Sequence, residues 1–149
     1  MSLLAAAILA AAASSAVPPT VSKADVRKKQ AVAAAIDARR ADLASLADQV
    51  WGFAETALRE TRSAALLADY AEKQGFHVER GVAGMPTAFV ASYGQGRPVI
   101  AVLGEYDALP GLSQKAVPER VVLQADAPGH GCGHNLFGAA SLGAAVAVK

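Results

Sequence analysis

The sequence is poor in several features that carry function in other proteins. It has one cysteine, Cys132, which excludes an intramolecular disulfide. Its 14 basic and 13 acidic residues nearly cancel, so it lacks the positive field that binds nucleic acid or an anionic membrane. It contains no phosphate-binding glycine loop, no dinucleotide fingerprint and no Gly-x-Ser-x-Gly motif around Ser113, which argues against nucleotide binding and serine-hydrolase chemistry. A composition of 53% hydrophobic and 18% charged residues instead fits one globular domain, or a piece of a larger one.

The first residues have the composition of a targeting segment. Residues 1–16 form an apolar run that is too short to span a bilayer and that ends in small residues. This pattern predicts a signal peptide with cleavage after Ala16, and hence a periplasmic or secreted protein. No Lys or Arg precedes the apolar run, so an alanine-rich helix in a cytoplasmic protein is the alternative. In an exported protein the unpaired Cys132 needs another explanation, and metal ligation is one.

Two helices are expected next. From about residue 21 to residue 53, apolar side chains recur at three-, four- and seven-residue steps, which predicts one long amphipathic helix with a single buried face. A second helix is predicted to begin near Thr61 or Ser63, either of which could cap it, and to end at Gly75.

Three strands are expected after these helices. Residues 76–80, 87–93 and 98–103 are short segments rich in Val, Phe and Ile, a composition typical of β-strands. The third segment is apolar without alternation, as in a central strand that is covered on both faces. A further helix is predicted from about residue 136 to the end. This order of helices and strands predicts an α/β domain.

A long irregular stretch, residues 104–135, holds the polar residues that are best suited to chemistry. Glu105 and Asp107 come just past the end of the predicted central strand, where open α/β sheets place ligand sites. Cys132 and His134 lie two residues apart among glycines, so that a thiolate and an imidazole can face one divalent cation.

The spacing of Cys132 and His134 leaves two alternatives open. One is a glycine-rich turn without metal, in which Asn135 caps the following helix. The other is a nucleophilic Cys132 activated by His134. Two residues of separation within one loop suit shared metal ligation better than proton transfer between these side chains.

Two long motifs occur in this chain, Leu103–Gln114 (LGEYDALPGLSQ) and Gly129–Gly138 (GHGCGHNLFG). Together with Glu60–Ser63 and the second predicted helix, they closely resemble the aminobenzoyl-glutamate hydrolase branch of the zinc aminoacylase/carboxypeptidase family. The resemblance implies a zinc-exopeptidase-like fold. Residues 17–149 would then be the N-terminal portion, truncated, of a mixed-sheet catalytic domain with flanking helices.

The resemblance also implies roles for single residues. Cys132 and His134 would ligate the metal, and Asp107 would orient the site without being a ligand itself. Glu105 stands where more distant members of the family have a ligand histidine. A carboxylate can bind a metal ion, but this chemical suitability does not by itself predict that Glu105 is a ligand. The glycines on either side of His130 predict, independently of the resemblance, that this residue stabilises the loop, and a further metal ligand or a substrate contact is the alternative.

Two other polar residues are interpreted as surface residues without a part in the site, His77 and Asp126. The activity implied by the resemblance is metal-dependent hydrolysis of the amide bond in N-acyl or N-aroyl amino acids, with p-aminobenzoyl-glutamate as the nearest family substrate. Zn²⁺ is the expected cofactor, with Mn²⁺ or Co²⁺ as alternatives.

The family carries its general base in a pair of glutamates downstream of the Cys-Gly-His loop, and this chain has no such pair. We therefore expect a fragment that is inactive alone, from a full-length protein that could form a homodimer. The alternative is a non-catalytic fragment that binds a metal or a partner.

Overall fold

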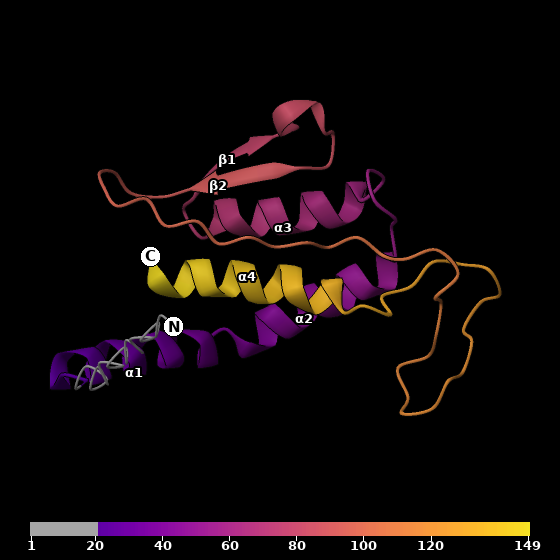
Figure 1. The fold of residues 1–149 in the computed structure, drawn as a ribbon, viewed down its shortest axis with the longest axis horizontal. Helices are drawn as coiled ribbons and strands as arrows, with labels where there is room; N and C mark the ends of the chain where they lie inside the picture. The colour runs from indigo at the N-terminus through magenta and orange to yellow at the C-terminus, as the bar shows by residue number, and fades with distance from the viewer. Residues whose placement is uncertain (1–20) are drawn as a thin grey trace, which may run out of the picture.

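The computed structural model describes residues 21–149, so the predicted signal peptide at residues 1–16 lies outside the described residues. Four α-helices, a short 3-10 helix and two strands follow one another along the chain (Figure 1). Their bounds are α1 Lys23–Asp37, α2 Arg40–Phe53, α3 Thr61–Lys73, β1 His77–Arg80, η1 Val82–Gly84, β2 Phe89–Ser92 and α4 His134–Val148. No helix within residues 21–149 has the length and apolar character needed to cross a membrane.

The prediction of one continuous helix from residue 21 to residue 53 is wrong, because the chain bends between α1 and α2. Arg39 has a φ of −110° and a ψ of 8°, and it separates the two helices. Helix α1 begins in a capping box formed by Ser22 and Asp25 and has no buried residue, whereas α2 buries Leu46, Ala47 and Val50. Neither glycine nor proline marks the bend, so the apolar period alone did not reveal it.

The two ends of α3 are stabilised by different interactions. Helix α3 begins at Thr61, but the cap is the carboxylate of Glu55, which accepts hydrogen bonds from the backbone N–H groups of Arg62 and Ser63. At the other end, Gly75 has a φ of +84° and its N–H bonds the carbonyl of Glu72, which confirms it as the stop. The predicted capping by the Thr61 or Ser63 side chain is wrong, since both hydroxyls donate to Glu55.

Two of the three predicted strands are confirmed. Strands β1 and β2 pair antiparallel, with His77 opposite Ser92 and Arg80 opposite Phe89. The prediction for residues 98–103 is wrong for the described chain, because this segment is extended but pairs with no strand and its apolar side chains are exposed. Helices with a small two-stranded sheet are compatible with the α/β class.

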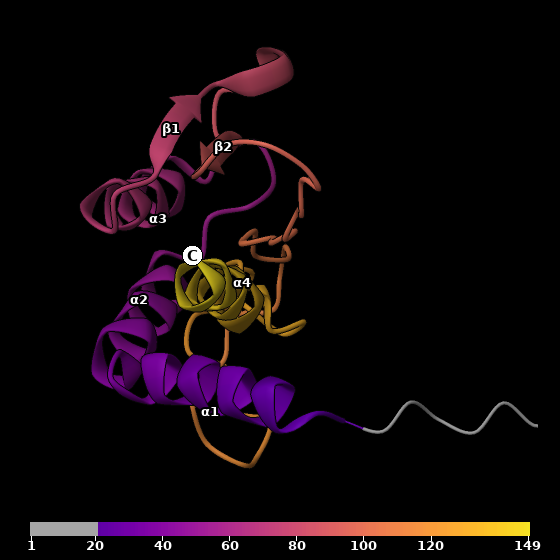
Figure 2. The same cartoon turned by 90° about the vertical axis from the view of Figure 1, so that its left-hand side faces the viewer.

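The core lies where α2, α3 and α4 meet. Figure 2 looks nearly along α4 and shows α1 and α2 on one side of it, with α3 and the strands on the other. The largest buried apolar side chains come from all three helices: Leu46, Val50, Leu67, Tyr70, Leu142 and Val146. Helix α4 approaches its neighbours closely through glycine, since a Cβ on Gly138 would lie 2.9 Å from the carbonyl oxygen of Glu105. That approach brings the residues after 103 to the side of α4.

Candidate metal centre

Three side chains from the two motifs meet at the start of α4. Nδ1 of His134 lies 2.7 Å from Oδ1 of Asp107, and its Nε2 lies 3.1 Å from Oε2 of Glu105. The group offers one imidazole nitrogen and two carboxylate oxygens that all lie within 4.8 Å of one another. Asp107 and Glu105 come 27 and 29 positions before His134 in the chain, and the three side chains nevertheless form one cluster.

Backbone pairing between the two motifs holds this cluster together. Leu109 and Gly129 exchange two hydrogen bonds, each of 3.0 Å between nitrogen and oxygen, so the loop between them is closed at its base. The N–H of Ala108 donates to the carbonyl of Glu55 at 2.7 Å, which ties the first motif to the end of α2. Gly129 must be glycine, because a Cβ there would lie 2.2 Å from the carbonyl oxygen of Leu112.

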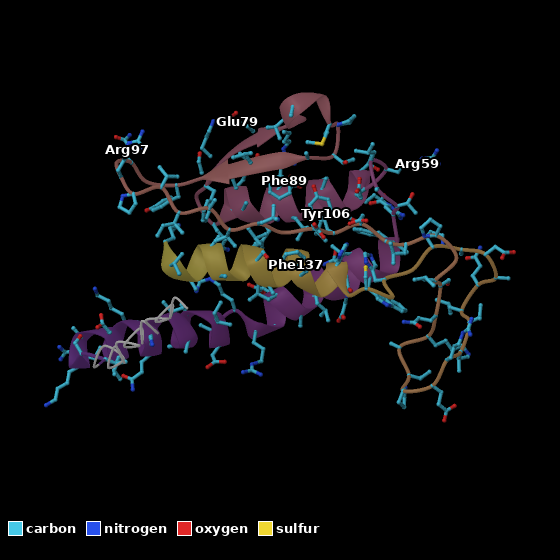
Figure 3. All side chains as sticks on the ribbon, in the orientation of Figure 1. Arg59, Glu79, Phe89, Arg97, Tyr106 and Phe137 are labelled. Atoms are coloured by element: carbon cyan, nitrogen blue, oxygen red, sulfur yellow. The ribbon has the colours of Figure 1, made fainter. Side chains whose placement is uncertain are left out.

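A buried polar group supports the first motif from the other side. The hydroxyl of Tyr106 donates to the carbonyl of Thr87, whose own hydroxyl donates to the buried Glu60 carboxylate at 2.7 Å. Figure 3 labels Tyr106 and Phe89, whose rings stack with centroids 6.0 Å apart. Burial, and then the charge of Glu60, raise the pKa of Tyr106 to about 12, so that its hydroxyl remains a donor at neutral pH.

His130 connects the second motif to α2. It is buried, and its Nε2 lies 3.1 Å from the carbonyl oxygen of Val50, to which it must donate because a carbonyl only accepts. Burial lowers the pKa of His130, which keeps the ring neutral. This contact fits the predicted loop-stabilising role.

Asn135 also reaches α2 from the second motif. It is buried within α4 and donates to the carbonyl of Ala47 at 3.3 Å. The alternative in which Asn135 caps the helix is therefore wrong; Gly133 is the N-cap residue, with a φ of +83°.

The other predicted residues lie apart from the cluster. Cys132 is exposed, and its thiol is not among the ligand atoms grouped around His134. His77 lies on exposed β1 and Asp126 in an exposed part of the loop, as predicted for surface residues. Sequence reasoning missed Glu55, Tyr106 and Thr87, whose contacts depend on segments that are distant in the chain.

The donor atoms of the cluster fit a divalent cation. Carboxylate oxygens and an imidazole nitrogen are ligands for zinc, and a carboxylate-rich set also suits manganese or cobalt. Asp107 is positioned to accept a hydrogen bond from Nδ1–H, an arrangement that leaves the Nε2 lone pair of His134 directed towards Glu105. The geometry therefore brings Glu105 together with Asp107 and His134, whereas Cys132, the other ligand that the resemblance implied, lies outside this group.

No protein-family model matches the chain. A curated relative does: one of the subunits of p-aminobenzoyl-glutamate hydrolase from Escherichia coli (strain K12) is 52% identical over 116 residues, which are 77% of this chain. This match confirms the resemblance to the aminobenzoyl-glutamate hydrolase branch. The matched residues are 24% of the relative, so the chain spans about a quarter of its length.

Proposed function

We propose that this chain supplies part of the active site of a metal-dependent hydrolase, which cleaves the amide bond of N-acyl or N-aroyl amino acids. The substrate class follows the relative, which is named for p-aminobenzoyl-glutamate. The observation that carries the proposal is the convergence of Glu105, Asp107 and His134 within 4.8 Å, in a chain 52% identical to that hydrolase component.

Each residue of the cluster has a distinct part in this proposal. In this proposal His134 and Cys132 bind the metal ion. Glu105 is a third candidate ligand, because its carboxylate faces Nε2 of His134. Asp107 holds the His134 ring in one tautomer and orientation through the 2.7 Å hydrogen bond at Nδ1. When bound, a divalent cation supplies the Lewis acidity that activates water and polarises an amide carbonyl. Zn²⁺ is the proposed ion, with Mn²⁺ or Co²⁺ as alternatives.

The surroundings hold these groups in place for that task. The neutral His130 and the buried Asn135 tie the second motif to the carbonyls of Val50 and Ala47 in α2. Tyr106 ties the first motif to Thr87. Both sides of the cluster are therefore anchored in the core, which limits the rotation of His134 and Asp107 and preorganises the ligands.

A second proposal is a polypeptide that binds metal or a partner without catalysis. The exposed position of Cys132, outside the group around His134, favours it. The relative is named as one subunit of a hydrolase, which supports assembly with further polypeptide, either a second kind of chain or a homodimer. Location in the periplasm or outside the cell remains a proposal from the composition of residues 1–16.

The test replaces the 116 matched residues of the E. coli relative with those of this chain and measures metal content and hydrolysis of p-aminobenzoyl-glutamate. We expect the chimera to hydrolyse the substrate, and His134→Ala and Cys132→Ala to lower both metal content and rate. His77→Ala, which removes an exposed histidine on β1, is the matched control. A folded chimera whose metal content and rate are unaffected by His134→Ala contradicts the proposal. If His134→Ala lowers metal content and rate but Cys132→Ala does not, only the assignment of Cys132 as a ligand is contradicted.

A further inference from the structure

A cavity of about 200 Å³ lies between the end of α2 and the irregular loop that precedes α4. Residues 51–54 form one side of this cavity, and residues from both ends of the loop form the other. Figure 1 shows the loop extending beyond the end of α2. Both long motifs contribute residues to the cavity, since Ser113 belongs to the first and His130 to the second.

None of the described residues that line this cavity carries a charged side chain. Its apolar surface comes mainly from two aromatic residues, Trp51 and Phe53, and from Leu123. Its polar side chains are those of serine, glutamine and histidine, and burial lowers the pKa of His130, which keeps that ring uncharged. An aromatic pocket with a few neutral polar groups suits an uncharged ring, and it disfavours a carboxylate because no cation there would compensate the loss of water.

The size of the cavity suits one aromatic ring. An apolar cavity of about 150 Å³ is large enough to bind benzene. A volume of about 200 Å³ therefore leaves space for a benzene ring with a small substituent. Phe53 already stacks with the guanidinium of Arg62, which is itself paired with Glu55. Trp51 is therefore the aromatic side chain that is better placed to stack with a ligand.

We propose that this cavity is the acyl-group subsite of the proposed hydrolase, and that it binds the uncharged aromatic ring of an N-aroyl amino acid. This inference rests on the proposed function, and it narrows the substrates from N-acyl to N-aroyl compounds. The relative is named for p-aminobenzoyl-glutamate, a molecule with an uncharged aromatic half and a half that carries carboxylates. Only the aromatic half matches a lining without charge.

Both sides of the cavity continue into the residues around the candidate metal centre. On the loop side, Gly129 exchanges two backbone hydrogen bonds with Leu109, two residues after Asp107. On the α2 side, the next residue along the chain is Glu55, whose carbonyl accepts a hydrogen bond from the N–H of the residue after Asp107. The amide carbonyl of an N-aroyl amino acid is bonded directly to the ring. A ring bound in the cavity therefore keeps that carbonyl on the side of the metal centre.

A second cavity of about 200 Å³, beside α3 and the strands, suits the ring less well. Its lining includes Arg80, which is paired with Asp69 and Glu72, so a ligand there has charged neighbours. It includes no residue of either long motif. The cavity at the end of α2 is therefore the one that we assign to the aromatic ring.

Binding can be measured on this chain directly, because Trp51 is its only tryptophan and gives a single indole N–H signal in an NMR spectrum of nitrogen-labelled protein. The full chain is titrated with p-aminobenzamide, which has the ring without the glutamate, and with N-acetylglutamate, which has the glutamate without the ring. We expect p-aminobenzamide to shift the signal with half-saturation in roughly the millimolar range, as for a ligand of about ten non-hydrogen atoms. No saturable shift, or an equal shift with N-acetylglutamate, overturns the proposal.

Two neighbouring positions in the loop provide matched variants. Leu123 lines the cavity and Val122 does not, and the two residues are 57% and 56% exposed. Leu123→Asp and Val122→Asp should therefore both leave the melting temperature nearly unchanged. We expect Leu123→Asp to weaken binding of p-aminobenzamide at least about tenfold, because it places a charge beside the ring, and Val122→Asp to weaken it less than about twofold. Equal binding by wild type and both variants would show that the ligand is bound elsewhere.

Kinetics of the chimera separate this subsite from the proposed function. In an active chimera, Leu123→Asp should raise KM for p-aminobenzoyl-glutamate at least about tenfold and leave the metal content unchanged, whereas Val122→Asp should change neither. An active chimera whose KM is unaffected by Leu123→Asp overturns the subsite and leaves the proposed hydrolysis intact. A folded chimera without activity contradicts the proposed hydrolysis, whatever p-aminobenzamide does at Trp51.

Discussion

The Glu55 carboxylate caps α3 from outside the helix, and its removal should destabilise the chain measurably. Its side chain is 10% exposed and accepts hydrogen bonds from the N–H and hydroxyl of Ser63, each at 3.0 Å, and from the N–H of Arg62 at 3.1 Å. Glu55→Ala leaves the first turn of α3 and the fully buried Ser63 hydroxyl without an acceptor. A lost cap costs about 0.5–2 kcal/mol and a buried unpaired hydroxyl about 1–3 kcal/mol.

Because both losses share one carboxylate, we expect them to be less than additive and to total about 2–3 kcal/mol, or a melting temperature lower by roughly 6–12 °C. Thermal unfolding followed by circular dichroism measures the change. Glu79→Ala is the matched control, since Glu79 is exposed on β1 and should change stability by less than about 0.5 kcal/mol. A melting temperature of Glu55→Ala equal to that of the control would refute the role of Glu55 as a cap.

The same contact predicts the dependence of stability on pH. Burial of the Glu55 carboxylate raises its pKa, but the hydrogen bonds from Ser63 and Arg62 outweigh burial, so the pKa lies below the ordinary value of 4.5. The stabilisation is therefore present above about pH 4.5 and is lost as the pH falls through the lowered pKa. In Glu55→Gln the side-chain shape remains and the charge is absent, so stability should fall less steeply with acid. Identical pH profiles for wild type and Glu55→Gln would contradict this linkage.

Three further predictions concern the candidate metal centre and its supports. Asp107→Asn should weaken metal binding about 10–100-fold, measured by competition with a chelating dye, because the amide holds the histidine ring less firmly; unchanged affinity would contradict the orienting role. Gly129→Ala should destabilise the chain strongly, since the added Cβ would lie 2.2 Å from a backbone oxygen. The control is Gly52→Ala in α2, whose Cβ meets nothing within 4 Å and which should stabilise the chain by about 0.5–1 kcal/mol. Equal melting temperatures of these two variants would be evidence against a tightly packed loop base at Gly129. Tyr106→Phe should remove the phenolate absorbance step near pH 12. Because the pKa of Tyr106 is raised in the folded chain, the stability that its hydroxyl contributes should be full below about pH 10 and decline towards pH 12. An unaltered absorbance step would assign that ionisation to another tyrosine.

The sequence predicted the local elements that depend on short-range signals. Gly75 ended α3 because a left-handed residue closes the last turn, and the two confirmed strands followed their Val- and Phe-rich composition. The bend at Arg39 escaped prediction, because each half of the apolar pattern is equally helical and the two helices differ only in the tertiary structure, where α1 buries no residue and α2 buries three.

In the candidate metal centre too, some features could be predicted from the sequence and others depend on tertiary packing. The resemblance to the aminobenzoyl-glutamate hydrolase branch predicted that Asp107 and His134 belong to one site, and the structure places these two side chains 2.7 Å apart. Glu105 was a weaker candidate from the sequence, and its position 3.1 Å from His134 follows from the Leu109–Gly129 pairing, which no local pattern encodes.

The sequence by itself determined the chemistry that this chain can offer and the preference of each segment for helix or strand, because both depend on residue type and near neighbours. Tertiary structure alone decided that Glu55 caps α3, that His130 and Asn135 anchor the second motif to α2, and that residues 98–103 are left without a partner strand within the described chain. Those outcomes depend on contacts between residues distant in sequence. Their geometry is set by how helices pack around the core, which local propensity does not specify.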